Sequence, residues 1–177
     1  MDFKQKPVFL CGMRGAGKSA IGKALAEKLD VPFSDLDDLI EESEGLTIPE
    51  IFELHGEKYF RKIERKLLLH HAKTIYGVVA LGGGSLQNQQ LVDVLKSNGW
   101  LIFLNPSRDI LLERLKKSKR RPMLKKMKNK ELEQRINNLL DERLPMYRQA
   151  HFSITTENGP ISEAVEQIIK KLDQYDS

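Results

Sequence analysis

Three glycines, a lysine and a serine near the start of the chain have a spacing that suits phosphate binding. Gly12, Gly17, Lys18 and Ser19 satisfy the pattern G-x-x-x-x-G-K-[ST] of the phosphate-binding P-loop. Glycines let backbone N–H groups converge on an anion, and a following helix adds its positive N-terminal end. Lys18 is then expected on the β- and γ-phosphates of ATP, and the Ser19 hydroxyl on Mg²⁺. The predicted nucleotide-binding residues of this loop are Gly15, Ala16, Gly17, Lys18, Ser19 and Ala20.

Two carboxylates follow the next apolar segment of the chain. Asp35 and Asp37 alternate with period two, so in a strand they would share a face and point into one crevice. One carboxylate can hold Mg²⁺ directly or through water, while the other accepts a hydrogen bond from an attacking hydroxyl. The alternative, acids that complement the dipole of a following helix, fits Asp38 and Glu41.

A run of three glycines and two arginines complete the set of candidate residues. Gly82, Gly83 and Gly84 follow an apolar segment, and glycines at this position indicate that the backbone closely approaches a ligand. The alternative, a flexible loop, is less favoured there. A planar guanidinium binds a carboxylate through two hydrogen bonds, which lysine cannot do. Taken alone, Arg61 and Arg143 are more typical of ordinary surface charges of helices than of a binding site.

The apolar patterns along the chain alternate between strands and helices. Strands are predicted within 7–12, 31–37, 77–84, 100–105 and 151–155. Helices are predicted over 18–29, over 47–73 with an interruption at 55–56, and over 89–98, 107–117, 129–150 and 161–175. This alternation predicts a parallel sheet covered on both faces, which binds ligands outside the carboxyl ends of its strands.

Composition narrows the class of protein. The chain has 177 residues, which favours one domain. It lacks an apolar stretch long enough to span a membrane, which makes a cytoplasmic location the expectation.

Its one cysteine, Cys11, is expected to be a small buried residue. Residues 116–130 carry nine basic and no acidic side chains, so the positive net charge is local, and the lack of interleaved aromatics argues against nucleic-acid binding.

Several motifs in the same order resemble those of the shikimate kinases, small P-loop kinases of aromatic amino-acid biosynthesis. Residues 35–64 follow the family pattern D-x-D-x-x-I-E and then G-E-x-x-F-R-x-x-E. Three further matches are "LGGGS" at 81–85, "RPML" at 121–124 and "RLPMYR" at 143–148. The resemblance runs from about residue 7 to residue 170, and four ordered motifs are more specific than a P-loop alone.

The resemblance implies a three-layer α/β/α P-loop kinase fold with a five-stranded parallel sheet and a mobile lid. One domain would span residues 1–177, with an acceptor-binding region at about 36–64 and the lid at about 116–128. The implied activity is ATP-dependent phosphorylation of the 3-hydroxyl of shikimate. The resemblance also implies a monomer that binds ATP and shikimate and uses Mg²⁺ as cofactor. It implies neither nucleic acid nor a membrane as partner.

The resemblance also implies roles for individual residues. Asp37 would hold the acceptor hydroxyl and take its proton, and Asp35 would belong to the metal side with Ser19. Arg61 and Arg143 would clamp the shikimate carboxylate, and the loop at 82–84 would donate N–H groups to the acceptor. Arg121 would reach the nucleotide phosphates from the lid, so the implied catalytic residues are Lys18, Asp37 and Arg121. Arg114 would contact adenine, and Pro160 would flank the base.

Two other functions stay open at this point. A related P-loop kinase could act on another hydroxy acid such as gluconate, although the complete set of motifs is not expected there. A ligand-sensing module of the same fold would lack catalytic residues or carry an attached DNA-binding domain, and this sequence shows neither.

Overall fold

Strands and helices alternate along the chain. The computed structural model describes residues 6–117 and 129–176. The strands are β1 (Val8–Cys11), β2 (Phe33–Asp35), β3 (Val78–Ala80), β4 (Trp100–Leu104) and β5 (Phe152–Ile154). The helices of these residues are α1 (Lys18–Leu29), α2 (Leu36–Glu44), α3 (Ile48–Thr74), α4 (Gln89–Asn98), α5 (Arg108–Lys117), α7 (Asn129–Tyr147) and α8 (Ile161–Asp176).

The strands form one parallel sheet with the order β2-β3-β1-β4-β5. Val8 of β1 is in register with Val78 of β3 on one side and with Trp100 of β4 on the other. Phe9 and Ile102, from the central strands β1 and β4, have no exposed surface. The predicted five-stranded parallel sheet is therefore confirmed.

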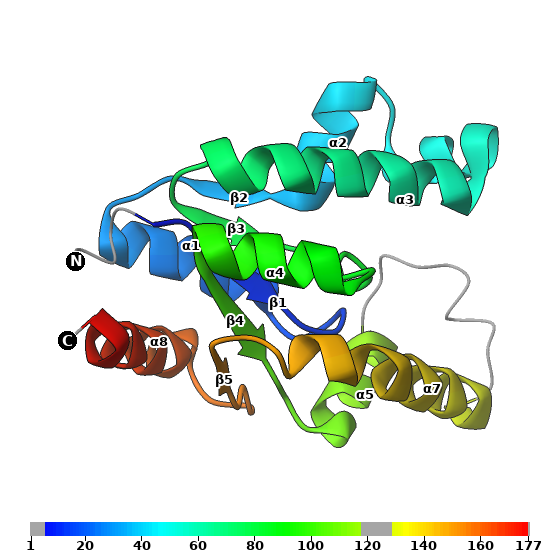
Figure 1. The fold of residues 1–177 in the computed structure, drawn as a ribbon. Coiled ribbons are helices and arrows are strands. Elements are labelled where there is room, and N and C mark those ends of the chain that lie inside the picture. Colours follow the sequence, from blue (N-terminus) through cyan, green and yellow to red (C-terminus); the bar gives the residue numbers. More distant parts are fainter. Residues whose placement is uncertain (1–5, 118–128, 177) are drawn as a thin grey trace.

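Helices cover both faces of the sheet (Figure 1). The connections from β1 to β2 and from β3 to β4 run in opposite directions across the sheet. Because such crossovers are right-handed, they place α1 and α4 on opposite faces. In turn, α8 packs against α1, and α3 packs against α4. The result is the predicted three-layer α/β/α arrangement.

The strand order reverses direction at β1, which lies between β3 and β4. In open α/β sheets, ligands bind outside the carboxyl ends of the strands at such a reversal. The P-loop follows β1, the two aspartates follow or end β2, and the three glycines follow β3. Sheet topology alone therefore brings these three segments to one edge.

Helix α3 begins and bends where the sequence indicates. Thr47 and Glu50 form a capping box, in which the Thr47 N–H donates to Glu50 Oε2 at 2.8 Å. The predicted interruption is at Gly56, whose φ of 79° and ψ of 172° are not helical. Among the described residues, α3 and the other helices are all too short or too polar to cross a membrane.

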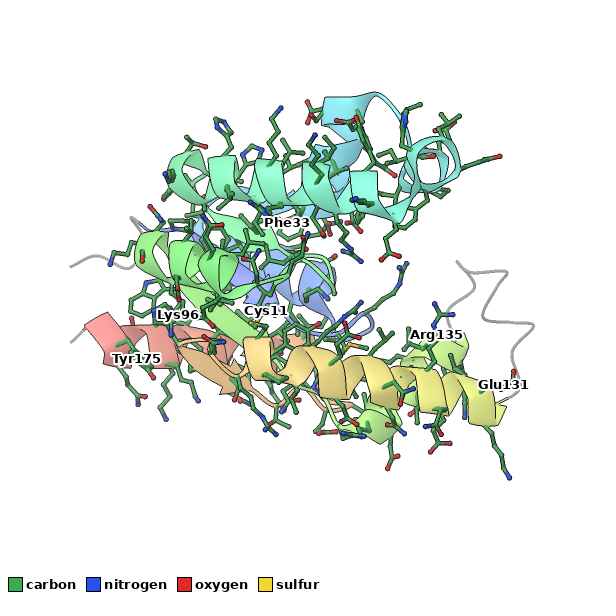
Figure 2. All side chains as sticks on the ribbon, turned by 45° about the vertical axis from the view of Figure 1, so that its right-hand side comes forward. Cys11, Phe33, Lys96, Glu131, Arg135 and Tyr175 are labelled. Carbon is green, nitrogen blue, oxygen red and sulfur yellow. The ribbon has the colours of Figure 1, made fainter. Side chains whose placement is uncertain are left out.

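Cys11, at the end of β1, lies in the interior of the molecule (Figure 2). Its side chain is completely buried, and this burial raises the pKa of the thiol from 9.0 to about 12. A thiol with that pKa stays protonated and unreactive at neutral pH. Cys11 is thus a core residue, as predicted.

Candidate active site

The P-loop runs from the end of β1 to the start of α1 and encloses the Lys18 side chain. Lys18 Nζ donates hydrogen bonds to the carbonyl oxygens of Gly12 at 2.8 Å and Met13 at 2.9 Å. Gly12 has a φ of 143°, and a Cβ there would lie 2.5 Å from the Leu104 carbonyl oxygen, so only glycine fits. Gly17 is the N-cap of α1. The ammonium group is therefore placed at a helix N-terminus, where anions bind.

The charge of Lys18 depends on pH in an accessible range. The side chain is half-buried, and desolvation lowers its pKa from 10.5 to about 8. Phosphate groups nearby would favour the charged form. We therefore expect ADP binding to take up protons near pH 8 and to weaken as the pH rises further.

Calorimetric titration of ADP in buffers of different ionisation enthalpy measures this proton uptake. Lys18→Met is the reference, because methionine has no amino group to take up a proton, while the phosphates of ADP titrate as they do with the wild-type protein. The difference between the two proteins should grow from about pH 7 to about pH 9. A difference of zero across that range would contradict the assignment.

A cavity of about 760 Å³ lies between the P-loop and the segment after β5. This volume is ordinary for a small-molecule site. Arg114 connects its two sides, because Nη1 donates to the Gly15 carbonyl at 3.1 Å and Nη2 to the Glu157 carbonyl at 3.1 Å. Ala16 of the P-loop is fully buried, and its carbonyl oxygen accepts a hydrogen bond of 3.3 Å from Thr156 Oγ1. The predicted nucleotide-binding residues that line the cavity are Gly15, Gly17, Ala20, Arg114 and Pro160.

Asp35 and Asp37 do not share a strand face, so the interpretation of their period-two spacing is wrong. Strand β2 ends at Asp35, whose Oδ1 accepts a hydrogen bond of 3.0 Å from the Asp37 N–H and caps α2. This cap starts the helix at Leu36 and places Asp37 in its first turn. Asp35 Oδ2 accepts a hydrogen bond of 2.6 Å from Ser19 Oγ. The two residues predicted for the metal side, Ser19 and Asp35, are thus in contact.

The carboxyl group of Asp37 has a raised pKa. Much of this side chain is exposed, but the surrounding protein partly desolvates its carboxyl group, which is the main cause of the rise. The negative charges of Asp35 and Glu64 raise the pKa further, whereas Arg14 and Lys18 oppose the rise. A carboxylate of raised pKa at the mouth of a phosphate-binding loop is a stronger base than an ordinary surface aspartate.

Arg61, on α3, is oriented by two glutamates of the same helix. Its Nη1 donates to Glu64 Oε2 at 2.7 Å, and its Nε lies 3.6 Å from Glu57 Oε1. Glu64 is only 1% exposed, so its contact with Arg61 is the stronger constraint. The Arg61 side chain as a whole is 28% exposed, so it can still meet a ligand.

The glycine loop, residues 82–84, brings the two arginines together. A Cβ on Gly83 would lie 3.2 Å from Arg143 Nη1, and one on Gly84 would lie 2.8 Å from Nη1 and Nη2 of Arg61. Side chains in this loop would therefore displace the guanidinium groups. The residues predicted to bind the acceptor, from α2, α3, α7 and this loop, meet at one edge of the sheet.

Glu64 is a member of this site that sequence reasoning did not single out. Its Oε1 accepts a hydrogen bond of 2.7 Å from Ser85 Oγ, and its Oε2 one of 3.0 Å from Gln87 Nε2. Gln87 Nε2 also donates to the Arg61 carbonyl oxygen at 3.1 Å. The last glutamate of G-E-x-x-F-R-x-x-E was the available signal, but its partners lie 21 and 23 residues away.

Removing the Ser85 hydroxyl should weaken this buried network. Ser85→Ala leaves one oxygen of a buried carboxylate without its donor, so we expect the free energy of unfolding to fall by about 1–3 kcal/mol. Urea denaturation measures the change. Ser153→Ala, at an exposed position of β5, is the matched control and should stay near wild type. Equal stability of the two variants would show that the network adds nothing.

One predicted catalytic residue is not placed by the structure. Arg121 and the lid from residue 118 onward lie outside the described residues 6–117 and 129–176. Within the described part, no group of three or more His, Cys, Asp or Glu side chains could hold a metal ion. A Mg²⁺ that also binds phosphates needs only one or two protein ligands, so the Ser19 and Asp35 oxygens are a suitable pair.

Comparison with known proteins identifies the family. The sequence model of the shikimate kinase family matches residues 14–173. The chain belongs to the shikimate kinase family. The shikimate kinase of Sulfurihydrogenibium sp. is 41% identical over 167 residues, which cover 94% of this chain and 98% of that relative.

Solved structures of shikimate kinases agree with this membership. The shikimate kinase from Acinetobacter baumannii in complex with shikimate superimposes with a TM-score of 0.87 at 34% identity, covering 98% of this chain and 96% of that one. A gluconokinase from Sinorhizobium meliloti covers 99% of this chain and 95% of its own, with a TM-score of 0.56 at 19% identity. That second likeness shows the fold alone.

Proposed function

We propose that this member of the shikimate kinase family transfers the γ-phosphoryl group of ATP to the 3-hydroxyl of shikimate. The observation that carries the proposal is the meeting of two guanidinium groups at the glycine loop, with Asp37 and the P-loop beside them. Shikimate carries one carboxylate and several hydroxyls. Two arginines suit the carboxylate, and one aspartate suits the reacting hydroxyl.

In the proposed reaction, the chain contributes mainly position and charge. Arg61 and Arg143 bind the carboxylate, and Asp37 accepts a hydrogen bond from the 3-hydroxyl. The hydroxyl oxygen forms a bond to the γ-phosphorus as the bond from that phosphorus to the β,γ-bridging oxygen breaks. Asp37 takes the hydroxyl proton, and ADP leaves with the bridging oxygen. Lys18 stabilises charge on the β- and γ-phosphates throughout.

The nucleotide and metal roles belong to the same proposal. Residues 15–20 would hold the phosphates, with Arg114 and Pro160 near the base. Ser19 and Asp35 would hold Mg²⁺, which when bound would neutralise phosphate charge. The contact of 2.6 Å between Ser19 Oγ and Asp35 Oδ2 supports this assignment, because it brings the two oxygens side by side.

Four further parts of the proposal rest on the sequence. The segment at about 116–128 acts as a lid that excludes water, and Arg121 reaches the phosphates from it. Residues 1–177 make up one domain, with the acceptor region at about 36–64. The enzyme acts as a monomer. Its location is the cytoplasm.

An assay of ADP formation tests the proposal directly. ATP and Mg²⁺ are incubated with shikimate, with gluconate or with neither acceptor. We expect ADP to form in the incubation with shikimate and not in the other two incubations. Turnover with gluconate alone would favour the related kinase, and binding of shikimate without any ADP would favour the ligand-sensing module.

A further inference from the structure

Tyr147, the last residue of α7, links that helix to the glycine loop. Its side chain is 1% exposed, and its ring stacks on Phe103 of β4 with centroids 5.1 Å apart. The Tyr147 hydroxyl donates a hydrogen bond to the Gly83 carbonyl oxygen. Burial raises the pKa of this hydroxyl well above its usual value of 10, so it remains a donor at neutral pH.

The same hydroxyl lies beside the guanidinium group of Arg143. Arg143 precedes Tyr147 by four residues, so the two side chains are neighbours on one face of α7. Both groups also lie at Gly83, because a Cβ there would be 3.2 Å from Arg143 Nη1 and the Gly83 carbonyl oxygen accepts from the Tyr147 hydroxyl. Arg143 Nη1 also lies 3.8 Å from Met13 Sδ in the P-loop. One buried hydroxyl therefore meets both the loop and the arginine.

One backbone hydrogen bond is missing near the end of α7. Pro145 lies inside the helix and has no N–H to donate to the carbonyl four residues earlier. The Arg148 N–H still donates to the Leu144 carbonyl oxygen at 2.9 Å, so the Tyr147 hydroxyl adds a side-chain contact to the backbone bonds of this turn. The outer half of α7, where Glu131 and Arg135 are labelled in Figure 2, lies well away from the sheet.

We propose that Tyr147 is a positioning residue for acceptor binding, and that its hydroxyl fixes the Gly83 carbonyl relative to Arg143. This contact sets the loop N–H groups and the guanidinium in one geometry before the acceptor arrives. The inference rests on the proposed function, in which this loop and Arg143 bind shikimate. Tyr147 itself touches no substrate.

Tyr147→Phe is the decisive variant, because it keeps the packed ring and removes only the hydroxyl. Loss of one hydrogen bond should raise the KM for shikimate about tenfold, with the KM for ATP changed less than about twofold. Tyr175→Phe is the matched control. Tyr175 lies on α8 (Figure 2), donates to the His151 carbonyl at 2.9 Å, and has no contact with the glycine loop among its hydrogen bonds and ring contacts in the described residues.

A combination with Arg143→Lys separates positioning from general loosening. If Tyr147 acts through Arg143, the double variant should raise the KM for shikimate by less than the product of the two single effects. Equal increases in both KM values for Tyr147→Phe, or a KM for shikimate no different from that of Tyr175→Phe, would overturn the inference.

Amide hydrogen exchange provides a test that does not depend on catalysis. The N–H groups of Gly83 and Gly84 should exchange several-fold faster in Tyr147→Phe than in wild type or Tyr175→Phe. Unchanged exchange would also overturn the inference. A wild-type chain without shikimate-dependent turnover would instead reject the proposed function, so the two failures are distinguishable.

Discussion

Lys18→Met is expected to lower shikimate-dependent ADP formation by about 10²–10³-fold or more. The ammonium is held in the P-loop by the carbonyl oxygens of Gly12 and Met13, at the N-terminus of α1. In the mechanism we propose, Lys18 is the residue of the loop that supplies positive charge to the β- and γ-phosphates. Methionine keeps the length of the side chain but cannot stabilise the β- and γ-phosphates during transfer. Steady-state kinetics with saturating shikimate measure the loss.

The control for this variant is Lys23→Met, on the same helix. Lys23 is exposed, and its Nζ lies 5.7 Å from the centre of the Phe33 ring, so its replacement removes the same charge outside the site. Thermal unfolding of both variants checks that the fold is kept. Retention of more than about one tenth of wild-type kcat by Lys18→Met would be inconsistent with its role in transfer.

Asp37→Asn is expected to lower kcat by about 10²–10⁴-fold, the usual contribution of a general base. The amide can still lie near the acceptor hydroxyl, but it cannot take the proton. Asp37 sits in the first turn of α2, where the charges of Asp35 and Glu64 add to partial desolvation in raising its pKa. Asp38→Asn, one residue on and exposed, is the matched control and should retain near-wild-type kcat.

The pH profile of the same pair of proteins gives an independent readout. A base must be ionised to act, so wild-type kcat should fall as the pH falls through the raised pKa of Asp37, above the usual 3.8. Asp37→Asn should lose this acidic limb, and Asp38→Asn should keep it. An unchanged limb in Asp37→Asn would assign the titration to another group.

The elements of the fold were largely predictable, because local chemistry specifies them. The capping box at Thr47 and Glu50, the bend at Gly56 and the helix that starts at Lys18 all depend on residues close in sequence. Motif order also placed the P-loop and glycine loop at the carboxyl ends of β1 and β3. The backbone at Leu36 and Asp37 was predicted incorrectly, since the Asp35 side chain caps a helix there and ends the strand.

The supporting contacts of the site were not predictable from local pattern. Glu64 meets Ser85 across 21 residues, and Tyr147 meets Gly83 across 64. Nothing near either residue in the sequence indicates such a partner. Both contacts arise because parallel strands bring distant loops to one edge, which only the folded chain reveals. Arg114 was predicted only as an adenine contact. Its hydrogen bond to the Gly15 carbonyl also gives it a role in holding the P-loop.

The most direct test of the central claim is the structure of the product. The enzyme is incubated with ATP, Mg²⁺ and shikimate, and the mixture is analysed by ³¹P and ¹H NMR. The account predicts ADP together with a phosphate monoester whose phosphorus couples to the proton on C3 of shikimate. ADP accompanied only by inorganic phosphate, or an ester at another hydroxyl, would contradict it.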